Sequence, residues 1–228
     1  MTKASAQRMT SLAVLSAGFL CSSAAFATVV YDNSSTEVLR TYSPGSGIEF
    51  GDEVFLAGTD RTITEFRFET FISANANGNE TAQVILRLNN GAQLGPNRIA
   101  PGTELARSPV FALGTQIKDA PETHVWAGLS VPVASNHLTW SVVLNGIDSG
   151  EQIGLDLPNP PTPTIGSSYD DFWQNNAGTW QTMLIDAGTT PANFAARITA
   201  VPEPSTIALG GFGALTLLGY LGLRKRQA

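Results

Sequence analysis

The sequence is poor in the residues that most often carry out chemistry. Cysteine occurs once in 228 residues, as Cys21, and histidine occurs only twice. Because Cys21 lies in an N-terminal segment that we expect to be removed, the mature chain would lack disulfides, thiolate metal sites and a cysteine nucleophile. Charged residues make up 14% and hydrophobic residues 43% of the chain, which argues against a disordered acidic polypeptide and against a multi-pass membrane protein.

Positive charge is also scarce away from the two ends. Residues 28–206 contain eight of the thirteen basic residues but all nineteen acidic ones, a net charge of −11 compared with −6 for the whole chain. A domain this acidic is repelled by phosphate backbones, so nucleic-acid binding is disfavoured. Solubility outside the cell is the simpler explanation of the acidity.

Signatures of catalysis are missing as well. The sequence has no G-x-S-x-G elbow, H-E-x-x-H motif, P-loop or dinucleotide fingerprint. His124 and His137 are both expected at half-exposed strand ends. The carboxylate pairs Asp52-Glu53 and Asp170-Asp171 are neighbours in the chain, and neighbours on a strand point to opposite faces. We therefore predict that the protein is not an enzyme; a glycan-active enzyme would need two carboxylates facing each other across a cleft.

The N-terminus has the three parts of a secretory signal peptide, over residues 1–27. Lys3 and Arg8 give a positive first region, and residues 12–20 form an apolar stretch too short to span a bilayer comfortably. Ala25 and Ala27 provide the small-x-small pattern that signal peptidase recognises. This predicts a mature chain that starts at Thr28.

The C-terminus combines a proline-rich segment, a hydrophobic run and a basic end. Residues 201–206 read Val-Pro-Glu-Pro-Ser-Thr, and residues 207–223 follow as 17 uncharged residues. As a helix this run would be about 25 Å long, enough for a thin bilayer. Three basic residues, Arg224, Lys225 and Arg226, should remain cytoplasmic and stop transfer through the inner membrane. The signal peptide demands the same topology, with residues 28–206 on the far side.

This C-terminal pattern resembles the PEP-CTERM sorting signal of Gram-negative bacteria. Pro202, Glu203 and Pro204 match its defining residues, and Ser205 follows them. The resemblance implies recognition by exosortase, a membrane-embedded peptidase that would cut near the motif and pass the protein to the cell surface or to an exopolysaccharide matrix. The alternative is a plain single-pass anchor after a proline-rich linker. In either case the prolines keep the backbone extended just above the membrane.

The segment between the two ends reads as a single all-β domain, residues 28–200, followed by the sorting signal at 201–228. Short stretches with alternating apolar residues are bounded by Gly, Asn, Asp or Pro, which indicates strands joined by turns. The expected strands are 53–57, 63–71, 81–88, 125–133, 137–144, 179–185 and 194–201. This pattern is typical of an antiparallel β-sandwich, most simply jelly-roll-like, flanked by an N-terminal signal helix and a C-terminal transmembrane helix.

Part of the domain is similar to a known family. Residues 51–68, Gly-Asp-Glu-Val-Phe-Leu-Ala-Gly-Thr-Asp-Arg-Thr-Ile-Thr-Glu-Phe-Arg-Phe, resemble a block in the bacterial choice-of-anchor domains, which are secreted and rich in β-structure. The resemblance implies the fold and an extracellular location and brings no activity.

Two ligand hypotheses remain open. A carbohydrate could contact Tyr169, Asp171 and Trp173, which alternation would place on one face of a strand with aromatic rings beside a carboxylate. No cofactor is expected, with a stabilising Ca²⁺ as the alternative, because exported β-domains often bind it through loop carboxylates. The candidate oxygen ligands are Asp32, Asp52, Asp170 and Asp171. The leading prediction is a non-enzymatic surface or matrix protein, with a module that binds extracellular polysaccharide as the alternative.

Overall fold

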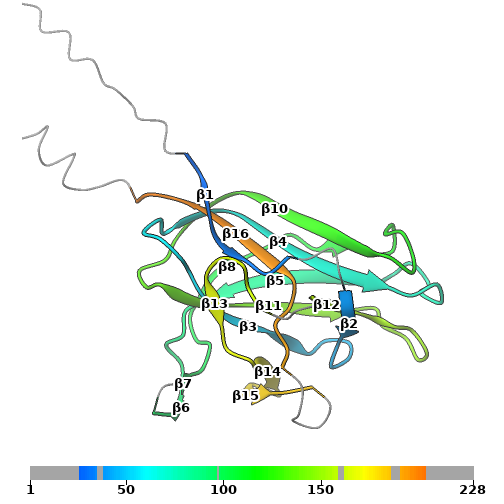
Figure 1. Cartoon of the computed structure of the whole chain (residues 1–228). Helices are drawn as coiled ribbons and strands as arrows, with labels where there is room; N and C mark the ends of the chain where they lie inside the picture. Colours follow the sequence, from blue (N-terminus) through cyan, green and yellow to red (C-terminus); the bar gives the residue numbers. More distant parts are fainter. Residues whose placement is uncertain (1–25, 35–37, 97, 159–161, 186–190, 204–228) are drawn as a thin grey trace, which may run out of the picture.

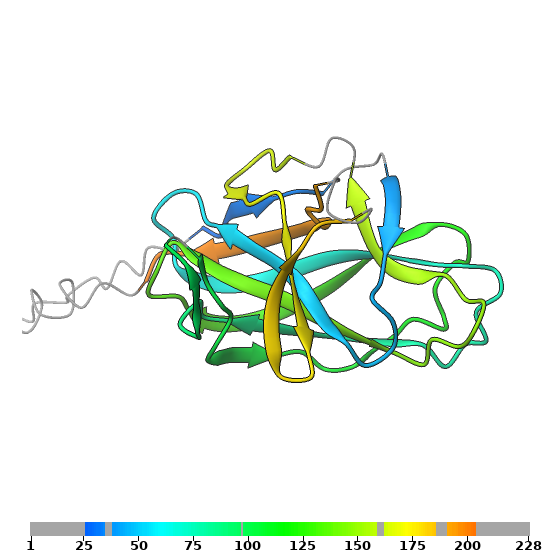
Figure 2. The same ribbon diagram turned by 90° about the horizontal axis from the view of Figure 1, so that it is seen from below.

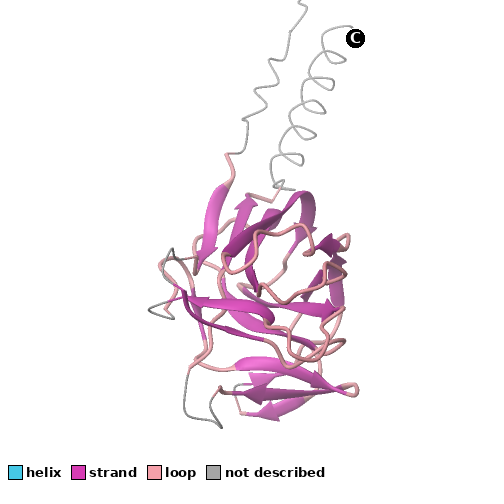
Figure 3. Ribbon diagram, turned by 90° about the vertical axis from the view of Figure 1, so that its right-hand side faces the viewer, coloured by secondary structure: helices cyan, strands magenta, loops and turns pink. Residues whose placement is uncertain are grey.

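The computed structural model describes residues 26–34, 38–96, 98–158, 162–185 and 191–203. Every regular element in these ranges is a β-strand, and all strand pairs are antiparallel (Figure 3). The expected all-β class is confirmed. The expected signal helix and C-terminal transmembrane helix lie outside the described residues, and none of the described segments forms a helix that could cross a bilayer.

The first sheet is built around one long central strand. This strand, β4, pairs along one edge with β10; its other edge pairs with β16 over its first half and with β12 over its last residues. Strand β1 then adds to β16, and β2 adds to β12. The six strands of this sheet are β1 (Thr28–Asp32), β2 (Val38–Tyr42), β4 (Thr62–Ile72), β10 (Pro121–Pro132), β12 (Ile153–Pro158) and β16 (Ala196–Val201).

The second sheet has the order β15-β14-β3-β11-β5-β8, with β13 also pairing with β3 and β9 with β5. Its strands are β3 (Glu49–Phe55), β5 (Thr81–Arg87), β8 (Glu104–Arg107), β9 (Phe111–Ala112), β11 (His137–Asn145), β13 (Ser167–Ser168), β14 (Phe172–Asn176) and β15 (Thr179–Met183). A separate small hairpin consists of β6 (Gln93–Gly95) and β7 (Arg98–Ile99).

The two sheets share one hydrophobic core. Figure 1 shows β10, β4 and β16 above β5, β11 and β3, and in the view from below the β14–β15 hairpin lies in front (Figure 2). Alternation explains the packing: Phe66 and Phe68 on β4 are fully buried, and Phe66 contacts Trp140 of the opposite sheet at 5.2 Å between ring centroids. Phe194, just before β16, packs against Phe50 at 5.5 Å. Burial of apolar surface is the dominant favourable term in folding, and these large aromatic side chains contribute strongly to it.

The observed strands overlap all of the expected segments, with ends that differ by up to four residues. β10 begins at Pro121, four residues before the expected start, and β3 begins at Glu49. Strand β12 was missed because all six of its residues are buried, so its sequence does not alternate. β1 and β2, with five residues each, were also missed.

Candidate functional site

The residues next to the expected processing sites come together at one edge of the first sheet. β1 is antiparallel to β16, and its first residue, Thr28, lies opposite Ala200. The start of the expected mature chain and the start of the sorting signal therefore leave the fold side by side, as the adjacent strands β1 and β16 show (Figure 1). The Thr28 hydroxyl donates to Asp60 Oδ2 at 2.5 Å, which ties this edge to the loop before β4.

The sorting segment follows the fold without a spacer. Val201 is the last residue of β16, and Pro202 and Glu203 come next, both exposed. Proline has no backbone N–H and cannot continue a paired strand, so the ladder ends where the motif begins. Ala27 is exposed. Of the other expected processing residues, Ala25, Pro204, Ser205, Arg224, Lys225 and Arg226 lie outside the described residues.

The three residues expected to contact sugar do lie together, and they surround an arginine. Arg98, on β7, places its guanidinium carbon 3.9 Å from the ring centroid of Tyr169 and 5.0 Å from that of Trp173. Its Nη2 donates to Asp171 Oδ1 at 2.6 Å, and its Nη1 lies 3.7 Å from Glu53 Oε2. This cluster attaches the β6–β7 hairpin to the outer face of the second sheet by charge-assisted and cation–π contacts.

In this arrangement Arg98 covers the face on which Tyr169, Asp171 and Trp173 were expected to contact a sugar. Trp173 is fully buried, and its indole N–H donates to Glu53 Oε2 at 3.3 Å. With Arg98 against it, the ring cannot stack on a sugar unless the hairpin moves away. Burial raises the pKa of Glu53, and the positive charge of Arg98 opposes that rise. The Trp173 ring is thus covered in this structure, and a sugar contact by Tyr169, Asp171 and Trp173 stays a prediction.

The carboxylate pairs behave as alternation predicts. Asp52 points into the core, where its Oδ2 accepts a hydrogen bond from the backbone N–H of Phe194 at 2.5 Å, while Glu53 faces Arg98 on the outer side. Burial raises the pKa of Asp52 well above its usual range. Asp32 accepts from Ser34, and Asp170 is exposed. Among the described residues, no three acidic, histidine or cysteine side chains gather closely enough to hold a metal ion, and a bound Ca²⁺ stays a prediction.

The two histidines occupy different environments. His137 starts β11 and is 31% exposed in its side chain, as expected, with Nε2 at 4.0 Å from Glu53 Oε1. The expectation for His124 was wrong. It lies inside β10, not at its start, and only 9% of it is exposed, because β10 begins three residues earlier and turns this side chain toward Phe68 in the core.

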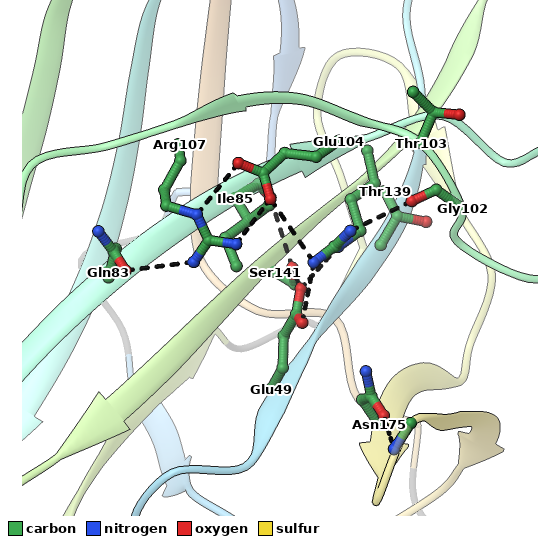
Figure 4. Close-up of polar contacts among 12 residues, drawn as sticks. Glu49, Gln83, Ile85, Gly102, Thr103, Glu104, Arg107, Thr139, Ser141 and Asn175 are labelled. Carbon is green, nitrogen blue, oxygen red and sulfur yellow. Dashed lines mark hydrogen bonds and ion pairs between the residues drawn. The ribbon is translucent and has the colours of Figure 1, made fainter.

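A second polar cluster, on β3, β5 and β8, was not found from the sequence. Glu49 accepts two hydrogen bonds from Arg87, at 2.7 Å from Nε and 3.1 Å from Nη2, and a third from the Ser141 hydroxyl at 2.6 Å. Glu104 and Arg107 continue the network at the edge of the sheet (Figure 4). These residues are far apart in the chain and only the strand register brings them together.

An open cleft of about 450 Å³ lies beside this network, between the β6–β7 and β14–β15 hairpins. Trp180 of β15 forms part of its wall, with the guanidinium carbon of Arg87 5.8 Å from its ring centroid. Leu94 of β6 is half-exposed on the opposite wall. Unlike Trp173, Trp180 is only partly covered, so its aromatic ring is open to a ligand in this cleft.

Comparison with known proteins identifies the C-terminal segment. The family model for the PEP-CTERM protein-sorting motif matches residues 200–227. The chain carries a PEP-CTERM sorting motif. The PEP-CTERM motif thus begins at Ala200, within the last strand, and includes Pro202 and Glu203 at the surface. It indicates a secreted protein with exosortase as its processing partner.

No curated protein and no solved structure matches the chain. The similarity of residues 51–68 to choice-of-anchor domains is not supported by these comparisons and stays a prediction.

Proposed function

We propose that the protein is a β-sandwich ectodomain that is exported, held at the inner membrane as a precursor, cut by exosortase near Pro204 and delivered to the cell surface or exopolysaccharide matrix without catalytic activity of its own. The observation that carries the proposal is the PEP-CTERM match directly after the last strand, with Pro202 and Glu203 exposed for recognition. The adjacency of Thr28 and Ala200 supports it, because a chain held at both ends by one membrane must bring both ends to one side of the fold.

The test is intact-mass measurement of the protein made by hosts with and without exosortase. The proposal expects medium or surface fractions to contain a chain that starts at Thr28 and ends near Pro204 only when exosortase is present. Glu203→Gln should leave the precursor in the membrane fraction. Asp170→Asn removes the same charge from an exposed site away from the motif and should process normally. Equal release of the Glu203→Gln variant, or release without exosortase, would rule the proposal out.

A second candidate function is binding of extracellular polysaccharide, and the cleft beside Trp180 favours it. Sugars stack on aromatic rings and take hydrogen bonds from charged and amide side chains, and here Arg87 and Thr179 lie at the ring. The test is retention of the secreted protein on the producer's own polysaccharide. Trp180→Ala should reduce retention at least about tenfold, given about 1.4 kcal/mol for a lost stacking contact, while the exposed first-sheet variant Val125→Ala should be retained like wild type. Equal retention of wild type and Trp180→Ala would exclude this site.

A further inference from the structure

Three buried polar side chains meet inside the fold at a place that the sorting function does not use. Thr70 lies on β4 and is fully buried, His124 on β10 is 9% exposed, and Gln116, in the loop between β9 and β10, is 5% exposed. The Thr70 hydroxyl oxygen is 2.9 Å from Gln116 Oε1 and 2.7 Å from His124 Nε2. A hydroxyl, an imidazole nitrogen and a carboxamide thus share one water-poor site. A nucleophile held against a base is the arrangement that covalent chemistry requires.

The carboxamide of Gln116 is fixed in orientation. Its Nε2 donates to the backbone carbonyl of Thr70 at 2.8 Å and to that of Ala120 at 3.2 Å. Both donors of the amide group are therefore used, so Oε1 must be the atom that faces Thr70. Thr70 therefore contacts the carboxamide of Gln116 twice: its hydroxyl group faces Oε1, and its backbone carbonyl accepts the hydrogen bond from Nε2. This double contact positions an electrophilic carbon next to a potential nucleophile.

His124 is placed to accept the hydroxyl proton. Its ring packs against Phe68 and Phe111, with centroids 5.0 and 5.8 Å away. Burial lowers the pKa of His124, and the charge of Glu122 partly offsets this, so the imidazole is neutral near pH 7. The hydroxyl can then donate either to Gln116 Oε1 or, when the proton of the ring is on Nδ1, to Nε2. In the second pattern the hydroxyl proton is held by His124, and the lone pairs of Thr70 Oγ1 are available to attack the carboxamide.

We propose that Thr70 and Gln116 react to form an intramolecular ester cross-link, with His124 as the general base. Oγ1 of Thr70 forms a bond to Cδ of Gln116, and His124 takes the hydroxyl proton. The Cδ–Nε2 bond then breaks, and the imidazolium returns the proton to the departing nitrogen, which leaves as ammonia. The atoms balance without an external reactant. Glu122 stabilises the transient imidazolium by its negative charge.

The burial of the site favours the ester over the two reactions that would break it, hydrolysis by water and attack by ammonia. Hydrolysis would need water at a site where all three side chains are almost completely buried, and ammonia that escapes is protonated and diluted in the medium. The cross-link would join the central strand of the first sheet to the loop that follows β9 of the second sheet. It would give an exported domain, whose chain has no cysteine besides Cys21, a covalent closure of the kind that disulfides usually supply.

Mass spectrometry of the purified full chain tests the proposal. Trypsin should release residues 68–87 and 108–118 as one species that is lighter than the two peptides together by about 17 Da, the ammonia lost in acyl transfer. Hydroxylamine should separate them. Thr70→Val should yield the two free peptides, and His124→Phe should slow cross-linking by about 10²-fold or more.

A built-in control is the pair Thr139 and Asn89, whose buried hydroxyl and amide are 3.0 Å apart. Among the described residues, no histidine forms a hydrogen bond with either side chain. Thr139→Val should leave the cross-link intact, and Asn89 should stay unmodified in wild type. Two free peptides from folded wild-type protein after prolonged incubation at pH 7–8 would overturn the proposal, and full cross-linking in His124→Phe would overturn the role of the base.

Discussion

Asp156 provides the sharpest test of the electrostatics of the fold. It lies on β12, no part of it is exposed, and neither of its carboxylate oxygens has a hydrogen-bond partner in the described part of the chain. Burial, together with the nearby charge of Glu69, raises the pKa of Asp156 from 3.8 to about 7. The perturbation is Asp156→Asn, which keeps the size of the side chain and removes its ionisation.

The sign of the effect follows from proton linkage. The folded-state pKa is raised, so folding is favoured where the unfolded chain is also protonated, below about pH 4, and that advantage is lost as the pH rises towards 7. A shift of one pKa unit corresponds to about 1.36 kcal/mol. The ionisable side chain of Asp156 therefore lowers the free energy of unfolding by about 2 kcal/mol at pH 5 and by about 4 kcal/mol at pH 7 and above. Asp156→Asn should thus be more stable than wild type by these amounts and nearly equal to it below pH 4.

The assay is urea and thermal unfolding of both proteins at pH 4, 5, 7 and 8.5. For a domain of this size each kcal/mol shifts Tm by about 2–4 °C, so the expected gain at pH 7 is about 8–16 °C. Asp170→Asn, a substitution of an exposed carboxylate, is the control and should show no pH-dependent gain. Equal stability of wild type and Asp156→Asn at pH 8.5 would refute the reasoning, as would a gain that is the same at pH 4.

Further substitutions test the packing and the polar network by their unfolding midpoints in urea. Gly51→Ala would place a Cβ 2.1 Å from the carbonyl oxygen of Trp140, and should destabilise the fold by about 3 kcal/mol or prevent folding; Gly95→Ala, where a Cβ meets open space, should not. Phe66→Ala removes a fully buried ring between the sheets and should cost about 3–5 kcal/mol. Glu49→Gln weakens the contact with Arg87, whose side chain is only 15% exposed, and should cost about 2 kcal/mol.

The sequence was informative where one face of a strand is buried and the other is open. β4, β5 and β11 alternate and were located almost to the residue. The same reasoning fails for β12, whose six residues are all buried because its outer face, which includes Asp156, is covered as well. Alternation does report which side chains share a face, so the grouping of Tyr169, Asp171 and Trp173 was expected. It cannot report that the β6–β7 hairpin, which carries Arg98, 73 residues before Asp171, covers that face.

The buried polar sites could not be predicted from the sequence for a related reason. Thr70, Gln116 and His124 belong to no motif of fixed spacing, and each is an ordinary residue in its own segment. Their meeting depends on the register between β4 and β10, which places His124 opposite Phe68 and thus diagonal to Thr70. Register is set by the burial of the entire strand, and a shift of one residue would turn His124 to the other face. The sequence predicted half-exposed strand ends for both histidines, so it gave no sign of a buried site at His124.

The position of β16 limits where processing can leave a stable product. β16 lies between β4 and β1 in the first sheet, and its residues Ile198 and Ala200 are fully buried in the core. A cut before Ala196 would remove this inner strand and leave β1 without a partner, whereas a cut after Val201 removes only residues that follow the sheet. Because the exposed residues of the sorting motif come directly after β16, the stable product of processing should keep the entire strand. A secreted form that ends inside β16 and still unfolds cooperatively would contradict this limit.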